Sequence, residues 1–180
     1  MKSDNSKPPE PLIEPVEAIL PDKSIVQGKF LLWYEDPNNR KFVRIVLQLN
    51  GKEIVSSGFT FYHTLKDIRL ELERDGVLLK CYGSSRRVWP SGMGLSMGRG
   101  LKAYKTVLGK KGDIKDMVSI FNSGTDVDPC TFEEQKEFHR QWLSSIGVNP
   151  DKKTYPWKAL FAQQPVKTLK LFVKEKLRRS

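Results

Sequence analysis

A glycine-rich segment at residues 91–100 is the part of this sequence best suited to bind a ligand. It reads Ser-Gly-Met-Gly-Leu-Ser-Met-Gly-Arg-Gly and holds four of the thirteen glycines. Glycine reaches positive φ without strain and has no side chain to block a ligand, so the segment either follows an unusual path or offers its backbone amides to a bound group. Residues 76–112 contain eight Lys or Arg and no Asp or Glu, which makes an anion the expected ligand.

Side chains near this segment complete a candidate site for a phosphate group or another anion. They are basic or carry a hydroxyl: Arg86, Arg87, Ser91, Ser96, Arg99 and Lys102. Residues 98–103 also fit G-x-G-x-x-A, but the residues that follow are typical of a strand, whereas a dinucleotide site needs a helix there. The alternative is that the glycines only permit a tight path and that Met93 and Met97 fill gaps in the core.

Three aromatic residues, Tyr82, Trp89 and Tyr104, lie near these cations in the sequence. Proteins that bind single-stranded nucleic acid stack bases on aromatic rings set among cations. Aromatic residues of strands are more often part of the core, so both interpretations stay open.

A second basic zone occupies residues 148–180, which contain nine Lys or Arg but only two acidic residues, Asp151 and Glu175. A helix is predicted from Pro165, because proline suits a first turn. One side of it is apolar: Val166, Leu169, Phe172, Val173 and Leu177. The other side carries the predicted partner-binding cations: Lys167, Lys170, Lys174 and Arg178. Such a helix either docks on the core with its charges in solvent or binds nucleic acid, an acidic protein or a membrane surface.

Catalytic and metal chemistry find little support, and we assign no catalytic residue, metal ligand or cofactor. His139 lies in the apolar side of a predicted helix, which is typical of a core histidine and not of a catalytic base. His63 precedes a predicted helix, where helix capping or solvent exposure explains it as well as a role as a base does. Cys81 and Cys130 are 49 positions apart and form no local ligand pair. Catalysis by a Cys-His pair would need a tertiary contact that the sequence does not reveal.

Length and composition predict one α+β domain. With 180 residues, 38% of them hydrophobic, the chain can build an ordinary core without disulfides or metals. The formal net charge of +10 suits a partner such as nucleic acid, anionic lipid or an acidic protein surface, or it only keeps the protein soluble. No apolar run is long enough to span a bilayer and no signal region is evident, so we expect a cytoplasmic protein.

The predicted elements make a mainly antiparallel sheet flanked by two or three helices. We expect a flexible proline-rich leader at 1–23, a core domain at 24–147 and a basic extension at 148–180. Residues 28–60 predict a three-stranded meander with an Asn50-Gly51 hairpin. Further strands are expected at 77–82, 101–108 and 117–121. One helix is predicted from Thr64 to Gly76, and another from the Thr131-Glu134 capping box to Gly147.

Four stretches together resemble a family of small uncharacterised bacterial proteins. They are Pro90–Met93, Met97–Tyr104, Phe132–Phe138 and Trp142–Leu143. The resemblance covers about residues 60–146 and implies no particular activity or site.

These observations favour a non-enzymatic binding protein that contacts a phosphate-bearing or acidic partner, such as nucleic acid, through the glycine-rich segment and the basic tail. One alternative is a protein-interaction module, such as an immunity or adaptor protein, whose basic face contacts an acidic protein. Another is an enzyme acting on a phosphorylated small molecule, which requires Arg99, Lys102 and one histidine to converge.

Overall fold

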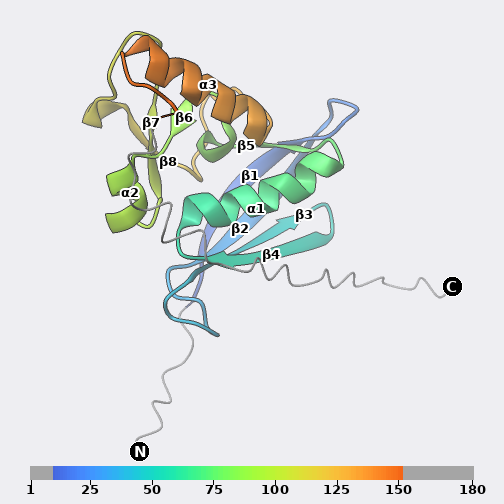
Figure 1. Cartoon of the computed structure of the whole chain (residues 1–180). Helices are drawn as coiled ribbons and strands as arrows, with labels where there is room; N and C mark the ends of the chain where they lie inside the picture. Colours follow the sequence, from blue (N-terminus) through green and yellow to red (C-terminus); the bar gives the residue numbers. More distant parts are fainter. Residues whose placement is uncertain (1–9, 152–180) are drawn as a thin grey trace, which may run out of the picture.

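Residues 10–151 are described by a computed structural model of the chain (Figure 1). They form two antiparallel sheets and three α-helices, which confirms the predicted α+β class. The elements are, in chain order, β1 Leu12–Ile19, β2 Ile25–Trp33, β3 Val43–Leu49, β4 Lys52–Gly58, α1 Phe61–Arg74, β5 Leu78–Lys80, β6 Val88–Trp89, α2 Gly92–Met97, β7 Lys102–Lys105, β8 Met117–Ser119 and α3 Phe132–Ser145.

The larger sheet has five strands in the order β4-β3-β2-β1-β5, and every neighbouring pair is antiparallel. The predicted meander is confirmed as β2, β3 and β4. Its hairpin is confirmed too, because Asn50 and Gly51 both have the positive φ that this turn requires, 48° and 74°. In β3, Ile45 and Leu47 point into the core while Val46 between them points to the opposite face.

The prediction that residues 1–23 form a flexible leader is wrong for strand β1. This strand pairs with β2 along its whole length and with β5 at residues 17–19. Val16 and Ala18 are buried in the core. The prolines of this segment argued against a strand in the sequence. Pro15, however, lies where β1 pairs with β2 alone, and a strand tolerates a missing N–H group on its unpaired side.

Helix α1 lies across one face of the larger sheet and begins earlier than predicted (Figure 1). Its N-cap is Thr60 and not Thr64, since the Thr60 hydroxyl accepts a 3.3 Å hydrogen bond from the His63 amide. Thr64 instead donates its hydroxyl to the Thr60 carbonyl. The predicted end is confirmed, because Gly76 has a φ of 71° just after the last turn.

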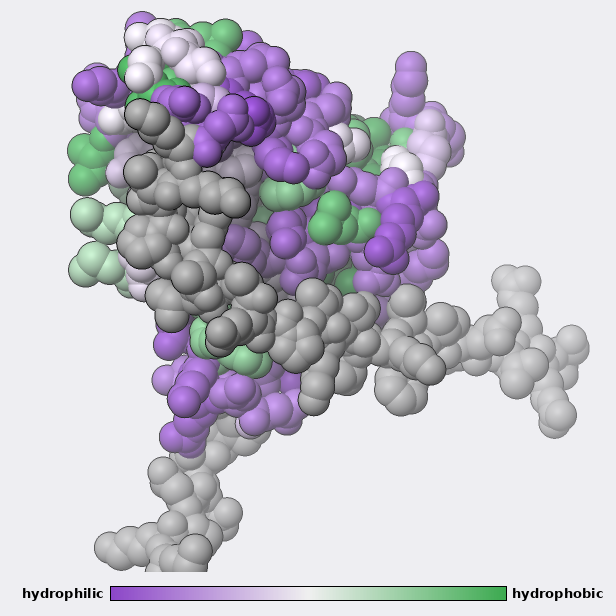
Figure 2. Space-filling view, viewed as in Figure 1, coloured by the Kyte–Doolittle hydropathy of each residue, from purple (hydrophilic) through white to green (hydrophobic). Residues whose placement is uncertain are grey.

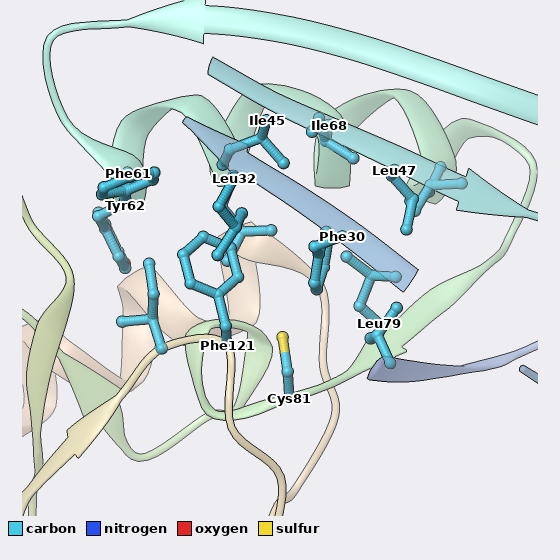
Figure 3. Close-up of a cluster of buried hydrophobic side chains, with 14 of the residues drawn as sticks. Phe30, Leu32, Ile45, Leu47, Phe61, Tyr62, Ile68, Leu79, Cys81 and Phe121 are labelled. Atoms are coloured by element: carbon cyan, nitrogen blue, oxygen red, sulfur yellow. The ribbon is translucent and has the colours of Figure 1, made fainter. Parts of the chain in front are cut away.

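The main core lies between α1 and the sheet. Figure 3 shows side chains of the strands meeting one of α1: Phe30, Leu32, Ile45, Leu47 and Ile68. The ring of Phe121, which follows β8, lies 5.1 Å from that of Phe30 and 5.7 Å from that of Phe61. The segment after the smaller sheet therefore packs into the same core.

The smaller sheet, in the order β6-β7-β8, forms the second half of the domain with α3. The strands predicted at 77–82, 101–108 and 117–121 are confirmed as β5, β7 and β8, each shorter than predicted. Helix α3 is confirmed with its capping box between Thr131 and Glu134, and Gly147 follows its end with a φ of 78°.

A buried arginine joins the two halves of the domain. Arg69 of α1 is 2% exposed and donates to the carbonyls of Gly83 and Cys130, each at 2.9 Å, and to Oε1 of Gln135 on α3. The Gln135 amide nitrogen donates to three carbonyls, those of Gly83, Ser85 and Val88. Glu73 supplies the opposite charge, 3.4 Å from Nε of Arg69. The charge is thus paired, and both Nη atoms are hydrogen-bonded, while Nε has the ion pair but no hydrogen-bond partner.

Between residues 10 and 151, no helix has the length and apolar character needed to cross a bilayer. Residues 1–9 of the predicted leader lie outside the described residues. So does the predicted helix from Pro165, with Lys167, Lys170, Lys174 and Arg178.

Candidate binding surface around helix α2

The glycine-rich segment is not an open loop, because most of it forms the short helix α2. The Ser91 hydroxyl accepts a 3.0 Å hydrogen bond from the Gly94 amide and caps the helix. The amides of Gly98 and Gly100 both donate to the Gly94 carbonyl, and the Leu101 amide donates to that of Gly98. These amides are already bonded within the segment, so they do not form the anion cradle that the sequence suggested.

Gly100 lets this segment pack tightly against the start of α1. It has a φ of 66°, and a Cβ atom there would lie 3.1 Å from Cβ of Tyr62 and from Cδ2 of Leu95. Next to it, the Arg99 carbonyl accepts a 2.7 Å hydrogen bond from the Phe61 amide. The geometry supports the alternative that the glycines serve a tight backbone path.

The two methionines of α2 are not core residues, contrary to that same alternative. Met93 is 71% exposed and Met97 is 82% exposed, whereas Leu95 on the other side of the helix is buried. Residues four apart share a face of a helix, so the methionines form one apolar strip on the surface. Figure 2 shows hydrophobic residues at the left edge of the molecule, where Figure 1 places α2.

Two of the six predicted ligand-binding residues serve the structure of α2 itself. Ser91 is its N-cap, and the Ser96 hydroxyl donates to the Met93 carbonyl at 3.2 Å. Arg99 donates from Nη1 to the Tyr34 carbonyl, which ties the segment to the end of β2.

Arg86 is neutralised by acids that come later in the chain. Its guanidinium lies 3.0 Å from Asp128 and 3.4 Å from Glu134. Burial would lower the pKa of Arg86, but the hydrogen bond to Asp128 and the nearby acids outweigh it and raise the pKa. Lys105 is paired in the same way with Asp126, at 2.9 Å. Folding therefore removes part of the positive charge that the local sequence concentrates here.

Arg87 and Lys102 are the predicted cations that keep their charge available. Both are exposed, and neither has an acidic partner within the described residues. The β6–β7 register pairs Trp89 with Tyr104, which places Arg87 near one end of this ladder and Lys102 near the other, beside α2. The separation is about 13 Å, from four residues of strand, so the two cations border a surface and do not converge on one point.

The three aromatic residues considered for base stacking are engaged elsewhere. The Trp89 ring stacks on that of His139 at 4.2 Å with an interplanar angle of 7°. Tyr82 donates its hydroxyl to Asp126 at 2.7 Å, and Nζ of Lys105 lies 5.3 Å from the centre of its ring. Tyr104 is half-buried. The surface thus presents little free aromatic face to a base.

Burial shifts the pKa values of the histidines and cysteines considered for catalysis. Burial lowers the pKa of His139 to about 4, and its Nδ1 is buried without a hydrogen-bond partner. Burial also lowers the pKa of His63, whose Nδ1 lies 2.7 Å from the Thr60 hydroxyl. Both cysteines are buried thiols, and burial raises the pKa of Cys81 and raises that of Cys130 to about 11. Within residues 10–151, no group of His, Cys, Asp or Glu is arranged to hold a metal ion.

No protein-family model matches this chain, and no curated protein matches it either. The comparisons therefore assign neither family nor function. The resemblance to small bacterial proteins remains a prediction.

Proposed function

We propose that the protein is a non-enzymatic binding protein that contacts an acidic protein through the α2–β7 surface, which comprises Arg87, Met93, Met97, Arg99 and Lys102. One observation carries the proposal: α2 exposes two methionines and lies with Gly94 against the backbone of Lys102, a cation without an acidic partner in the described chain. An apolar strip bordered by cations suits a partner that offers apolar side chains within an acidic rim.

The residue types support a protein partner. Methionine is flexible and polarizable, and it is common on surfaces that adapt to another protein. Methionine and arginine are both enriched at protein interfaces, and complementary charge speeds association and selects among partners. The net charge of +10 acts in the same direction.

Nucleic acid is supported less well by this geometry. The rings of Tyr82 and Trp89 are occupied, and the glycine-rich segment bonds its amides internally. Two exposed methionine side chains make no favourable contact with phosphate groups. The enzyme hypothesis has less support still, since burial lowers the pKa of both histidines and both thiols are buried with raised pKa values.

A reducing compartment suits this proposal. Cys81 and Cys130 are free and buried, as in most proteins of the cytoplasm. We therefore keep a cytoplasmic location as part of the proposal.

The test is photo-crosslinking in an extract of the source cells, with a photoreactive amino acid at position 97 of the full chain. We expect a discrete protein adduct that saturates and survives nuclease treatment. A matched control carries the same group at position 110, an exposed site in the loop after β7. An adduct that nuclease removes would favour nucleic acid. Equal labelling from both positions, or no adduct at all, would contradict the proposal.

A further inference from the structure

The face of the larger sheet opposite α1 carries a continuous apolar row across four strands. The register aligns Ile13 with Leu31, Leu31 with Val46, and Val46 with Val55. Their neighbours in each strand point to the α1 side, so these four residues share the other face. Strands lie about 4.8 Å apart, which makes the row about 14 Å long.

None of the described helices covers this row. Helix α1 packs on the opposite face, and α2 and α3 lie with the smaller sheet (Figure 1). Ile13 is 56% exposed, Leu31 and Val55 are half-buried, and Val46 is enclosed by its neighbours. Most neighbouring positions on this face are polar. One side of the row has Pro15, Lys29, Gln48 and Glu53, and the other has Trp33, Arg44 and Ser57. The row is therefore a bounded apolar strip and not a generally apolar face.

We propose that the C-terminal segment from Pro165 to Leu177 forms a helix that docks its apolar side on this row. That side presents five large residues: Val166, Leu169, Phe172, Val173 and Leu177. At about 1.5 Å per residue, Val166 to Leu177 spans about 16 Å, which matches the length of the row. Docking would bury two apolar strips at once, that of the segment and the row, which none of the described helices covers.

The connecting chain is long enough for this contact. Fifteen Cα steps separate Asp151, the last described residue, from Val166. They reach about 50 Å when extended, more than the width of a domain whose radius of gyration is about 15 Å.

The apolar side of the helix sets its orientation, because docking removes those large side chains from water. Charge on this sheet face is mixed: Lys29 is exposed, Glu53 is acidic, and Arg44 is ion-paired with Asp36 at 3.0 Å. Lys167, Lys174 and Arg178 then point to solvent. Since apolar contact provides the attraction, docking should change little with salt.

Paired cysteines in the full chain test this arrangement. With Val55→Cys and Phe172→Cys, we expect an oxidant to form a disulfide within one molecule across a dilution series. Val55→Cys with Lys174→Cys is the matched control, because residue 174 is on the opposite side of the helix. Met97→Cys with Phe172→Cys controls for random collision with another surface. The native Cys81 and Cys130 are buried and do not compete.

The expected result is at least a several-fold higher yield for the first pair than for either control. Equal yields from all three pairs would show that the segment does not dock on the row. Disulfides that form only between molecules would assign the row to a second copy of the chain, and would also overturn the proposal.

A second readout avoids new cysteines. In the full chain, Leu169→Ser with Phe172→Ser should increase the binding of an apolar dye by uncovering the row. Lys170→Ser with Lys174→Ser, which leaves the apolar side intact, should not. No difference between the two variants would contradict docking.

Discussion

Arg69 of α1 donates a hydrogen bond from Nη1 to Oε1 of Gln135 on α3, over a distance of 2.5 Å. Both side chains are buried, and together they bind the backbone of residues 83–88 to the two helices. The pair makes the association of the two halves of the domain depend on polar groups that are 66 residues apart in the sequence.

We therefore expect Gln135→Leu to lower the free energy of unfolding by about 3 kcal/mol, because it removes the buried hydrogen bonds of Gln135 to the Arg69 guanidinium and to the carbonyls of residues 83, 85 and 88. Urea unfolding measures the change. Gln141→Leu is the control, since Gln141 lies on the exposed side of the same helix, and its effect should stay within about 0.5 kcal/mol. Similar losses for both variants would mean that the network contributes little.

Gly83→Ala should destabilise the protein by about 2 kcal/mol. A Cβ atom at residue 83 would lie 2.5 Å from Cδ2 of Leu65 and 3.0 Å from the Ile120 carbonyl oxygen, so buried groups must shift. At Gly112 a Cβ atom would make only an ordinary 3.4 Å contact with Tyr104, and Gly112→Ala should be nearly neutral. Thermal unfolding of both variants gives the comparison, and equal melting temperatures would refute it.

His139 should make the protein less stable in mild acid. Burial lowers its pKa from 6.5 to about 4, so the unfolded chain takes up a proton before the folded chain does as the pH falls. Its contribution is complete above pH 6.5 and declines by up to about 3 kcal/mol as the pH approaches 4.

The variant His139→Phe keeps an aromatic ring against Trp89 but cannot titrate. Its free energy of unfolding should therefore fall less than that of the wild type between pH 6.5 and about 4. His63, whose pKa is also lowered, is present in both proteins and makes the same contribution to the pH dependence of their free energies of unfolding. Parallel curves for the two proteins would show that His139 titrates normally in the fold.

Removal of the free charges of the α2–β7 surface should weaken partner binding without loss of stability. We expect Arg87→Gln with Lys102→Gln to reduce affinity about tenfold, or about 1.4 kcal/mol, and to reduce the salt dependence of binding. The control, Lys110→Gln with Lys111→Gln, removes the same charge from exposed positions in the loop after β7. The affinity of each variant is measured from the yield of the photo-crosslinked adduct at position 97 as the partner concentration is varied. Equal weakening would indicate general attraction by the net charge.

Local patterns predicted most of the individual elements. Asn50-Gly51 fixes its hairpin through the φ preferences of two adjacent residues, and the Thr131-Glu134 capping box begins α3 where expected. Alternation of Val43, Ile45, Leu47 and Leu49 marks the buried face of β3. Each of these signals acts over a few residues, so one sequence is enough to detect it.

Features that depend on distant residues were missed. Strand β1 pairs with β5 only after the chain has folded back, and its prolines suggested a leader. Arg69 shares a helix with apolar residues, and nothing near it in the sequence reveals its partner Gln135. In the candidate site, Arg86 looked free because Asp128 and Glu134 are more than forty positions away. Only the tertiary structure shows that Arg86 is paired with acids, whereas Arg87 beside it has no acidic partner among the described residues.

The position of β1 between β2 and the edge strand β5 has a consequence for biosynthesis. Glu17 of β1 and Lys80 of β5, which form an ion pair, are 63 residues apart. While the chain emerges from the ribosome, β1 through β4 can pair in order, yet one edge of β1 stays open until β5 has been made. An unpaired edge is a site for aggregation. The nascent chain therefore passes through a period in which its first strand can pair with the wrong neighbour.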